Sequence, residues 1–322
     1  MKAIQLSQPG PAEAMHVVDV PTPEPKPNEA LVKIEAIGLN FIDVYHREGR
    51  YKLPTPFIPG SEMAGVVEKV GPDVKDLKPS DRVAQTGVVG TYADHQCVPA
   101  DRLVKIPDHV DFKTAAAIML QGGTMHYLMR SAYPLKARET ALVHAAAGGM
   151  GLLLTQFGKK LGAHIIGTAG SDEKTRMAKD AGADEVINYS KQDFVAEVKR
   201  MTGGTGVDVV YDGVGKSTFE GSLNCLRPRG YMVLFGGASG AVPPFDPITL
   251  TGKGSLFLTR PSLKDYTLTR EEYLWRMNDV LDMVSKGELK IHIGQTYKLA
   301  DAAEAHRDLE GRKTTGKSIL IP

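Results

Sequence analysis

The spacing of hydrophobic residues divides the chain near residue 110. Before that point short apolar runs alternate with polar residues, and they predict strands at Lys2–Leu6, His16–Val20, Glu29–Ile37, Met63–Val70, Arg82–Gln85 and Tyr92–Val98. Short strands separated by Pro and Gly are typical of a small barrel. The proline-rich stretch Pro21–Pro27 predicts an extended connector, because a proline has no backbone N–H to donate.

The middle of the chain alternates between strand and helix patterns. Asp111–Ser131 is helical in its spacing, interrupted by Gly122 and Gly123. Strands follow at Ala141–His144, His164–Thr168, Glu185–Ile187, Val207–Tyr211 and Tyr231–Phe235, each separated from the next by a helical segment. Such alternation predicts an α/β fold with a doubly wound parallel sheet and a ligand crevice at the carboxyl ends of its strands.

The last fifty residues follow neither the short-strand pattern nor the strand–helix alternation. We predict helices at Glu271–Lys286 and Ala300–Glu310, short strands near Ile291 and Tyr297, and a closing strand at Ser318–Ile321. This tail is expected to return to the first domain. The predicted domains are therefore 1–123 together with 268–322, and 124–267.

The junction between the strand at Ala141–His144 and the next helix carries a glycine pattern. Ala146, Gly148 and Gly151 stand at the three positions of the dinucleotide fingerprint G-x-G-x-x-G, with Ala in the first place. Gly148 would let the backbone approach a pyrophosphate, and Gly151 would let the helix pack against the strand. The helix N-terminus would direct its N–H groups and positive dipole end at the anion.

The composition argues against several other classes of protein. The 322 residues carry 39 basic and 38 acidic side chains, which argues against a dedicated nucleic-acid binder or a membrane-surface protein. Two cysteines, Cys97 and Cys225, are too few for a disulfide framework. With no signal-like start and no apolar run of membrane-spanning length, a cytoplasmic location is expected.

The loop after the second strand of the sheet indicates which nicotinamide cofactor is used. An NAD enzyme usually places a carboxylate at this strand tip, but here the strand runs into Gly167–Ser171. Ser171 and Lys174 are suited to a 2′-phosphate, which favours NADPH. Asp172 is interpreted as a first-turn acid of the following helix, and a solvent-facing helix surface remains the alternative for Lys174 and Arg176.

These residues together resemble a known family. The segments that carry the resemblance are Asn40–Asp43, Pro59–Gly65, His144–Gly151, Val209–Gly215 and Leu256–Pro261. They are similar to the zinc-independent quinone oxidoreductases of the medium-chain dehydrogenase/reductase superfamily. The resemblance implies a GroES-like catalytic domain, a Rossmann domain, NADPH in the interdomain cleft and a homodimer joined through edge strands near Ser255–Thr259.

The zinc-binding branch of that superfamily offers a test. Its catalytic metal is held by a cysteine and by the histidine of a Gly-His-Glu triplet, but this chain reads Gly60-Ser61-Glu62 and has no thiol near Asn40. Without three N or S ligands we predict no metal site. The acceptor would then have to be activated already, as a quinone or a conjugated enone is. Transfer from nicotinamide C4 is expected as hydride or as single electrons.

The predicted site includes residues inferred from local sequence patterns and residues implied by the family resemblance. Cofactor contacts are expected from Asn40, Thr124, Ala147, Gly148, Gly149, Met150, Gly151, Thr168, Ser171, Lys174, Tyr189, Phe235, Gly236, Ser239 and Arg312. Candidate catalytic residues are Asn40, Asp43, Tyr45 and Tyr51. We hypothesise that Tyr45 or Tyr51 donates a hydrogen bond to the oxygen that gains charge. Both tyrosines could instead simply fill space, with water supplying the proton.

One further motif is rejected. Residues Gly311–Ser318 match the phosphate-binding pattern G-x-x-x-x-G-K-[ST], but a helix precedes them and the chain ends in Ile-Leu-Ile-Pro. No helix can follow, so we interpret the stretch as a turn into the last strand with Arg312 as a cofactor contact. Two alternatives to a quinone reductase stay open: an enone or alkenal double-bond reductase, and a crystallin-like or RNA-binding protein without enzymatic activity.

Overall fold

The computed structural model describes residues 1–322. It divides into two compact units, one formed by Met1–Gly123 with Thr267–Pro322 and the other by Thr124–Tyr266. The fold class is α/β, as predicted. No helix is long and apolar enough to cross a membrane.

The first unit is built on a largely antiparallel sheet. Its strands are β3 (Glu29–Leu39), β4 (Glu62–Val70), β5 (Arg82–Thr86), β6 (His95–Pro99), β7 (Val104–Lys105), β14 (Ile293–Lys298) and β15 (Lys317–Ile321). Their order is β14-β15-β3-β4-β5-β7, and β6 pairs with β3. The separate pair β1 (Lys2–Gln5) and β2 (His16–Asp19) is antiparallel. The prediction of two short strands near Ile291 and Tyr297 is wrong: a single strand, β14, contains Tyr297, and Ile291 lies two residues before its start.

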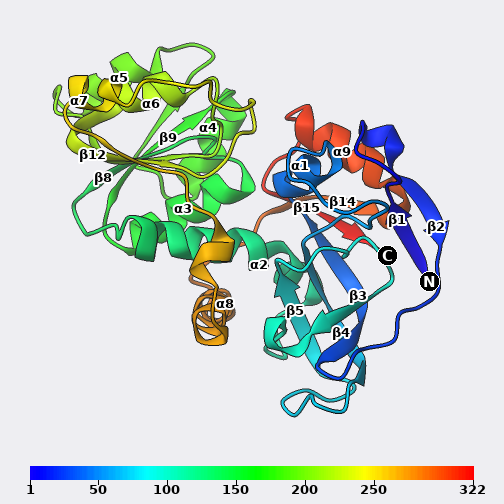
Figure 1. The fold of residues 1–322 in the computed structure, drawn as a ribbon. Helices are drawn as coiled ribbons and strands as arrows, with labels where there is room; N and C mark the ends of the chain where they lie inside the picture. The colour runs from blue at the N-terminus through cyan, green and yellow to red at the C-terminus, as the bar shows by residue number, and fades with distance from the viewer. The chain divides into compact units, whose positions relative to one another are not determined.

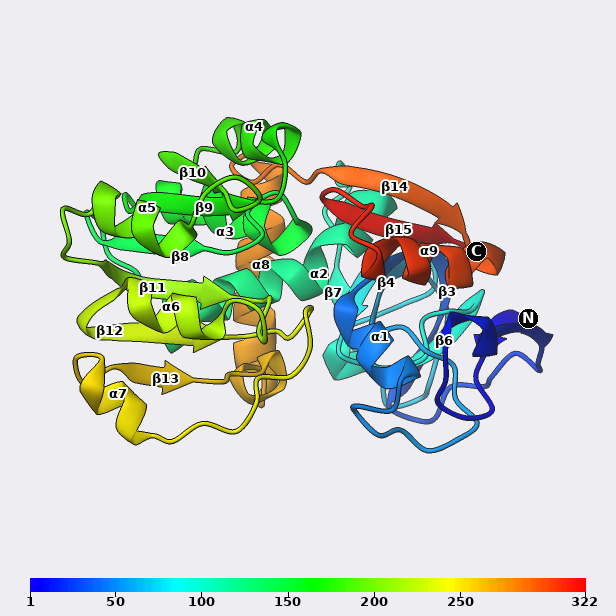
Figure 2. The same ribbon diagram turned by 90° about the horizontal axis from the view of Figure 1, so that it is seen from above.

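The chain's last strand lies inside this sheet, next to its edge strand β14. β15 lies between β14, which runs parallel to it, and β3, which is antiparallel. Figure 2 shows α9 (Ala302–Glu310) beside β14 and β15. Because Ile319 and Leu320 are fully buried, the strand is part of the core that also holds Ile37, Leu39 and Met63. The C-terminal segment thus completes the first unit.

Three further helices belong wholly or partly to this unit, and α2 leads into the second unit. They are α1 (Phe41–Arg47), α2 (Phe112–Tyr127) and α8 (Arg270–Ser285), and α2 continues into a π-helical turn at Leu128–Ala132. Single 3₁₀ turns lie at Ala12–Ala14, Ala100–Arg102, Leu263–Tyr266 and Leu299–Asp301. Gly122 packs inside the unit, because a Cβ there would come within 2.5 Å of Val280 on α8. The glycine pair therefore does not break α2.

The second unit contains the predicted doubly wound sheet. Its strands are β8 (Thr140–Val143), β9 (His164–Ala169), β10 (Glu185–Asn188), β11 (Val207–Asp212), β12 (Leu226–Leu234) and β13 (Phe257–Thr259). All neighbours are parallel and the order is β10-β9-β8-β11-β12-β13, as Figure 2 shows. From β8 the chain adds β9 and β10 on one side of the sheet, and then adds β11, β12 and β13 on the other side. The carboxyl ends of β8 and β11 therefore form a topological switch point.

Helices cover both faces of this sheet. They are α3 (Gly149–Lys160), α4 (Asp172–Asp180), α5 (Phe194–Met201), α6 (Phe219–Cys225) and α7 (Ile248–Gly252). In Figure 1, α5 and α6 lie above the sheet and α3 lies below it. The central strands are buried on both sides as a result, and Leu142, Ile166 and Val210 have no exposed surface. This explains why these strands read as continuous apolar runs.

Candidate functional site

The glycine turn of the second unit follows β8 directly. Ala145 has a positive φ of 51°, and the Gly148 N–H donates to the Ala145 carbonyl over 2.9 Å, which closes the turn before α3 begins at Gly149. A Cβ at Gly151 would lie 2.2 Å from that carbonyl oxygen and 2.5 Å from the Ala146 Cα. Only glycine allows the helix to start so close to the turn, as the fingerprint predicts.

This turn fits a pyrophosphate. The first N–H groups of α3, at Gly149, Met150 and Gly151, have no partners within the helix and stand at its positive dipole end. At Gly148 a Cβ would lie 3.3 Å from the Ala145 carbonyl oxygen, a tight contact with the backbone of the turn itself, so this position favours glycine. Together these features provide an anion-binding helix N-terminus at the switch point of the sheet.

A buried polar network lies behind the turn and was not predicted. His144 Nε2 is 3.0 Å from Ser222 Oγ, which donates to Asp212 Oδ2 over 2.9 Å. Since that hydroxyl hydrogen is used, Nε2 must donate, and Nδ1 accepts from the Thr168 hydroxyl at 3.0 Å. Burial lowers the pKa of His144, which keeps the ring neutral. The Thr168 side chain therefore faces inward and ties the ends of β8 and β9 together.

The residues predicted to contact the adenosine phosphate follow β9 and β10. Ser171 is the N-cap of α4 and its Oγ accepts from the Lys174 N–H at 3.2 Å, so the hydroxyl keeps a hydrogen to donate. Tyr189 is 46% exposed, and a Cβ at Gly170 would lie 2.6 Å from its hydroxyl. Asp172 stands in the first turn of α4, as interpreted, where its carboxylate accepts from Asn188 and Lys191.

The loop after β12 is fastened to the loop after β11. A Cβ at Gly236 would lie 2.4 Å from the Gly213 carbonyl oxygen, and the Phe235 ring covers the position where a Gly213 Cβ would be. The Ser239 hydroxyl donates to the Val214 carbonyl at 2.8 Å. The predicted contacts Phe235, Gly236 and Ser239 thus sit on a fixed loop at the carboxyl edge of the sheet.

In the first unit, Asn40 and Asp43 are joined at the start of α1. Asn40 precedes the helix, and its backbone N–H donates to Asp43 Oδ2 over 2.9 Å. The other carboxylate oxygen of Asp43 accepts from the Ser61 hydroxyl at 3.0 Å. Asp43 has no exposed surface, so any action on a ligand must pass through its neighbours.

The structure adds Glu62 and Lys317 to this cluster. Glu62 has no exposed surface and Lys317 only 2%, and Lys317 Nζ lies 2.6 Å from Glu62 Oε2. The same ammonium donates to Asn40 Oδ1 over 2.7 Å, while Glu62 Oε1 accepts from the Leu120 N–H. From the sequence, Glu62 was considered only as part of the triplet that would hold zinc, and Lys317 only as part of the rejected phosphate motif. No local signal marked Lys317 as buried, because a lysine at the start of an apolar strand usually lies at the surface.

A hydrogen-bonded chain connects Asp43 with the edge of the unit. Arg47 bonds both carboxylate oxygens of Glu310, at 2.8 and 2.9 Å, and approaches His306 Nδ1 at 3.5 Å. Burial lowers the pKa of His306 to about 3, which keeps the ring neutral. Because Arg47 can only donate to Nδ1, the hydrogen is on Nε2, which donates to the Tyr92 oxygen 2.9 Å away. Tyr92 in turn donates to Asp43 at 3.4 Å. The position of Asp43 thus depends on residues from α1, the segment before β6 and α9.

Burial raises the pKa of Asp43 to about 7, although the Asn40 and Ser61 donors and Lys317 act to lower it. The folded protein then retains a proton that the unfolded chain loses near pH 4, and stability falls as pH rises from about 4 to about 7. One proton contributes a slope of about 1.4 kcal/mol per pH unit. We expect Asp43→Asn to lack this slope in urea unfolding measured at several pH values. Equal slopes in both proteins would contradict the prediction.

The two candidate tyrosines lie at the end of α1. Their rings meet edge to face with centroids 5.5 Å apart, and the Tyr51 N–H donates to the Tyr45 carbonyl at 3.2 Å. Arg50 stands over the Tyr45 ring at 5.4 Å. Tyr51 is 44% exposed, which leaves part of its side chain accessible to a ligand. These contacts are compatible with a pocket wall and with a hydrogen-bond donor.

The remaining predicted residues occupy the ends of helices. Thr124 is a buried residue of α2, and Arg312 begins the turn between α9 and β15 with a φ of 59°. The rejected phosphate motif, Gly311–Ser318, is this turn and the start of β15, so its Gly-Lys-Ser end leads into a strand as interpreted. No group of three or more His, Cys, Asp or Glu side chains is placed to hold a metal ion.

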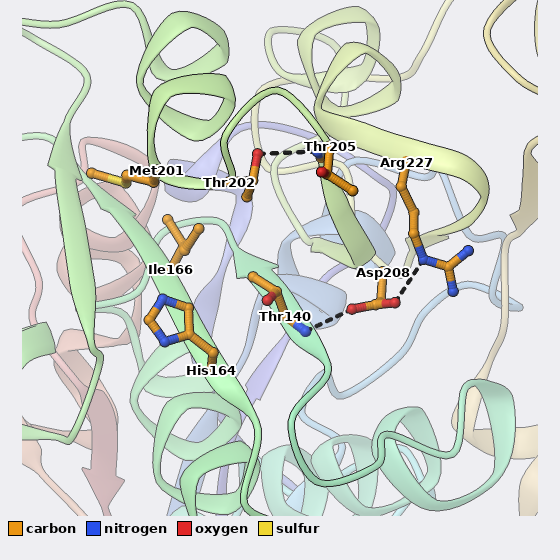
Figure 3. Close-up of a pocket in the computed structure, with 9 residues that line it drawn as sticks. Thr140, His164, Ile166, Met201, Thr202, Thr205, Asp208 and Arg227 are labelled. Carbon is orange, nitrogen blue, oxygen red and sulfur yellow. Dashed lines mark hydrogen bonds and ion pairs between the residues drawn. The ribbon is translucent and has the colours of Figure 1, made fainter.

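A pocket of about 300 Å³ lies elsewhere, at the amino ends of the strands of the second unit. Figure 3 shows Asp208 between Thr140 and Arg227, bonded to both. Because Thr140 and His164 are the first residues of β8 and β9, this pocket faces away from the glycine turn. Dinucleotides bind at the carboxyl ends of such sheets, so we assign the site to the turn and not to this pocket.

A GroES-like unit followed by a dinucleotide-type Rossmann unit defines a dehydrogenase or reductase of the medium-chain class. Comparisons agree: residues 26–108 match the alcohol dehydrogenase GroES-like domain and 149–279 the zinc-binding dehydrogenase family. A quinone oxidoreductase from Pseudomonas aeruginosa is 45% identical over 100% of this chain and 99% of its own. The chain therefore belongs to the quinone oxidoreductase family of the medium-chain dehydrogenase/reductase superfamily, which confirms the resemblance.

Two other relatives bear on the chemistry. The structure of Escherichia coli quinone oxidoreductase complexed with NADPH is 44% identical, covers all of both chains and superimposes with a TM-score of 0.98. A 2-haloacrylate reductase from a Burkholderia species is 40% identical over 94% of each chain. Family membership makes this protein an oxidoreductase, and its relatives include reductases of two kinds of activated acceptor.

Proposed function

We propose that this protein is an NADPH-dependent quinone reductase that needs no metal. The observation that carries the proposal is the glycine turn at the switch point, where a Cβ at Gly151 would meet the Ala145 carbonyl at 2.2 Å. The structural relative solved with NADPH supports the choice of cofactor. Bound NADPH supplies the reducing equivalents, as hydride or as single electrons, from nicotinamide C4 to the acceptor.

In this proposal the residues of the chain have three roles. The N–H groups of Gly149, Met150 and Gly151 bind the pyrophosphate. Asn40 contacts the nicotinamide end and orients it, while Asp43 holds the backbone of Asn40 in place through its 2.9 Å hydrogen bond. Tyr45 or Tyr51 borders the acceptor and donates a hydrogen bond to the oxygen that gains charge.

Selectivity for NADPH is assigned to Ser171, Lys174 and Tyr189. The Ser171 hydroxyl keeps a hydrogen to donate to a 2′-phosphate, and the Lys174 ammonium supplies an opposite charge. The Asp172 carboxylate accepts from Asn188 and from the Lys191 ammonium, so part of its negative charge is already paired. Arg312 is proposed as a further contact to the phosphate.

Lys174→Ala tests this assignment. Loss of one charge-assisted hydrogen bond, about 1.5–3 kcal/mol, should weaken NADPH binding roughly 10- to 150-fold and leave NADH binding almost unchanged. Dissociation constants of both cofactors, measured by fluorescence titration, give the comparison. Lys179→Ala on the last turn of α4 is the matched control, since it removes an equal charge from the same helix. An unchanged NADPH preference in Lys174→Ala would refute the placement of the phosphate.

Reduction of an activated carbon–carbon double bond is the second candidate. The 40% identical 2-haloacrylate reductase favours it, because a haloacrylate is a conjugated alkene that accepts hydride. The same cofactor site serves both reactions, so only the acceptor pocket distinguishes them.

A homodimer is also proposed. β13 is the edge strand of the parallel sheet, and Phe257 on it is half exposed while its ring stacks on Tyr231 with centroids 4.4 Å apart. An open edge with an exposed aromatic favours pairing with a second copy. A mass measurement by light scattering tests the proposal.

A further inference from the structure

Ala145 has a strained backbone at the start of the glycine turn. Its φ of 51° lies in the left-handed region, which glycine adopts freely but which is unfavourable for a residue with a Cβ. Its side chain is exposed, so packing against the core does not hold it in this conformation. A strained residue persists only where its surroundings fix it, and here the restraint comes from its neighbours in the chain.

The residues on both sides of Ala145 are hydrogen-bonded to Thr168, near the end of β9. The Thr168 carbonyl accepts from the Ala146 N–H at 2.9 Å, and the Thr168 hydroxyl lies 3.0 Å from His144 Nδ1. All three residues are buried, so water does not compete for these two bonds. Together the two bonds, which we call the Thr168 clamp, restrain the chain immediately before and after the strained position.

The direction of the side-chain bond in this clamp is determined by a buried carboxylate. Asp212 has no exposed surface and accepts from the Ser222 hydroxyl at 2.9 Å. Ser222 then has no hydrogen left for His144, so Nε2 donates to Ser222 over 3.0 Å and Nδ1 can only accept. With the proton on Nδ1 instead, the Ser222 hydroxyl would have to donate to Nε2, and the buried carboxylate would lose a donor. The Thr168 hydroxyl is therefore the donor to His144.

We propose that His144 and Thr168 are positioning residues, which clamp Ala145 in its left-handed conformation and so keep the glycine turn in the shape that receives the pyrophosphate. This inference rests on the proposed function and deepens it. The clamp places the Ala145 carbonyl, which accepts from the Gly148 N–H at 2.9 Å just before α3 begins. Without the clamp, Ala145 relaxes to a negative φ. NADPH then binds only the fraction of molecules whose turn is still formed, which lowers the apparent affinity.

Thr168→Val tests the clamp, because it removes the hydroxyl and keeps the branched shape. Loss of one hydrogen bond should weaken NADPH binding roughly 3- to 10-fold, and Thr168→Ser, which keeps the hydroxyl, should recover most of that loss. Affinity for adenosine 2′-phosphate, which has no pyrophosphate, should change by less than about twofold. Thr155→Val is the matched control and should change neither affinity, because Thr155 is also buried in this unit but its hydroxyl has no hydrogen-bond partner.

Ala145→Gly separates a positioning role from general destabilisation. Glycine gains nothing by leaving the left-handed region, so the turn should stay formed when Thr168→Val is added to Ala145→Gly. NADPH affinity should then fall by less than about twofold relative to Ala145→Gly itself. In urea unfolding, by contrast, the loss of stability from Thr168→Val should be no smaller in this background than in the wild type, because the hydrogen bond is lost in both.

A measurement on the wild-type protein without cofactor keeps the proposal testable if Thr168→Val does not fold. Spectra of ¹⁵N-labelled histidine at pH 7 should show His144 as a neutral ring with its proton on Nε2. Burial lowers the pKa of His144, which supports the neutral form. A proton on Nδ1 would overturn the proposal, since Thr168 could then not be the donor.

The remaining outcomes are distinct. Equal weakening of NADPH and adenosine 2′-phosphate binding in Thr168→Val, or an undiminished loss of NADPH affinity in the Ala145→Gly background, would overturn the positioning role. Failure of the wild-type protein to bind NADPH would instead refute the proposed function, while the histidine spectra would still report whether Thr168 donates to His144.

Discussion

Gly151→Ala is expected to abolish most of the NADPH affinity while leaving the second unit folded. The added methyl carbon would lie 2.2 Å from the Ala145 carbonyl oxygen and 2.5 Å from the Ala146 Cα, and backbone atoms cannot move aside cheaply. Overpacking of this kind costs about 1–3 kcal/mol. If the turn opens to relieve it, cofactor affinity should fall roughly 5- to 150-fold, because the N–H groups of α3 no longer converge.

The control for this change is Gly252→Ala at the end of α7, where an added Cβ meets nothing within 4 Å. Isothermal titration with NADPH measures both variants, and circular dichroism checks that both retain the α/β fold. Wild-type affinity in Gly151→Ala would show that the turn does not hold the pyrophosphate.

Glu62→Gln is expected to cause the largest loss of stability of any single change in the first unit. It leaves the Lys317 ammonium buried without a carboxylate, and removing one partner of a buried ion pair costs about 3–5 kcal/mol. The double variant Glu62→Gln/Lys317→Met, which removes both charges, should recover a large part of that loss. Urea unfolding of the two single variants and the double variant gives the coupling free energy.

An exposed ion pair provides the comparison. Glu24 and Lys69 also form an ion pair in the first unit, but their side chains are 75% and 56% exposed. Removing either one should change the free energy of unfolding by less than about 1 kcal/mol. If the losses of Glu62→Gln and Lys317→Met simply add in the double variant, the two side chains are not coupled as the structure indicates.

Much of the second unit could be predicted because its information is local. Strand and helix spacing, the caps and the glycine fingerprint all lie within a few residues of the elements they define. Even Asp172 could be assigned to the first turn of α4 from its place after Ser171. The turn was found for the same reason, since the clash that requires Gly151 comes from residues only five and six positions earlier.

The buried clusters could not be predicted because they are assembled from distant segments. Lys317 and Asn40 are 277 positions apart, and Lys317 and Glu62 are 255 apart. His144 finds Ser222 on a helix that follows the opposite half of the sheet. A charged residue next to an apolar strand is usually at the surface, so neither composition nor spacing indicated that Lys317 turns inward.

These clusters also refine the roles of the predicted site residues. Asp43 was predicted as a candidate catalytic residue, but its complete burial and its bonds to Asn40 and Ser61 make it a support for Asn40. Thr168 likewise supports the turn through His144. Tyr45, Tyr51 and Asn40 remain the candidates for direct contact.

The central claim is that the protein transfers reducing equivalents from NADPH to quinones. Steady-state oxidation of NADPH, followed at 340 nm with matched panels of quinones, conjugated enones and 2-haloacrylates, tests it most directly. We predict that kcat/KM is highest for a quinone and that NADH is a poorer donor with the same quinone. Higher kcat/KM for a haloacrylate or an enone would favour the double-bond reductase instead, and no oxidation of NADPH with any acceptor would contradict the account.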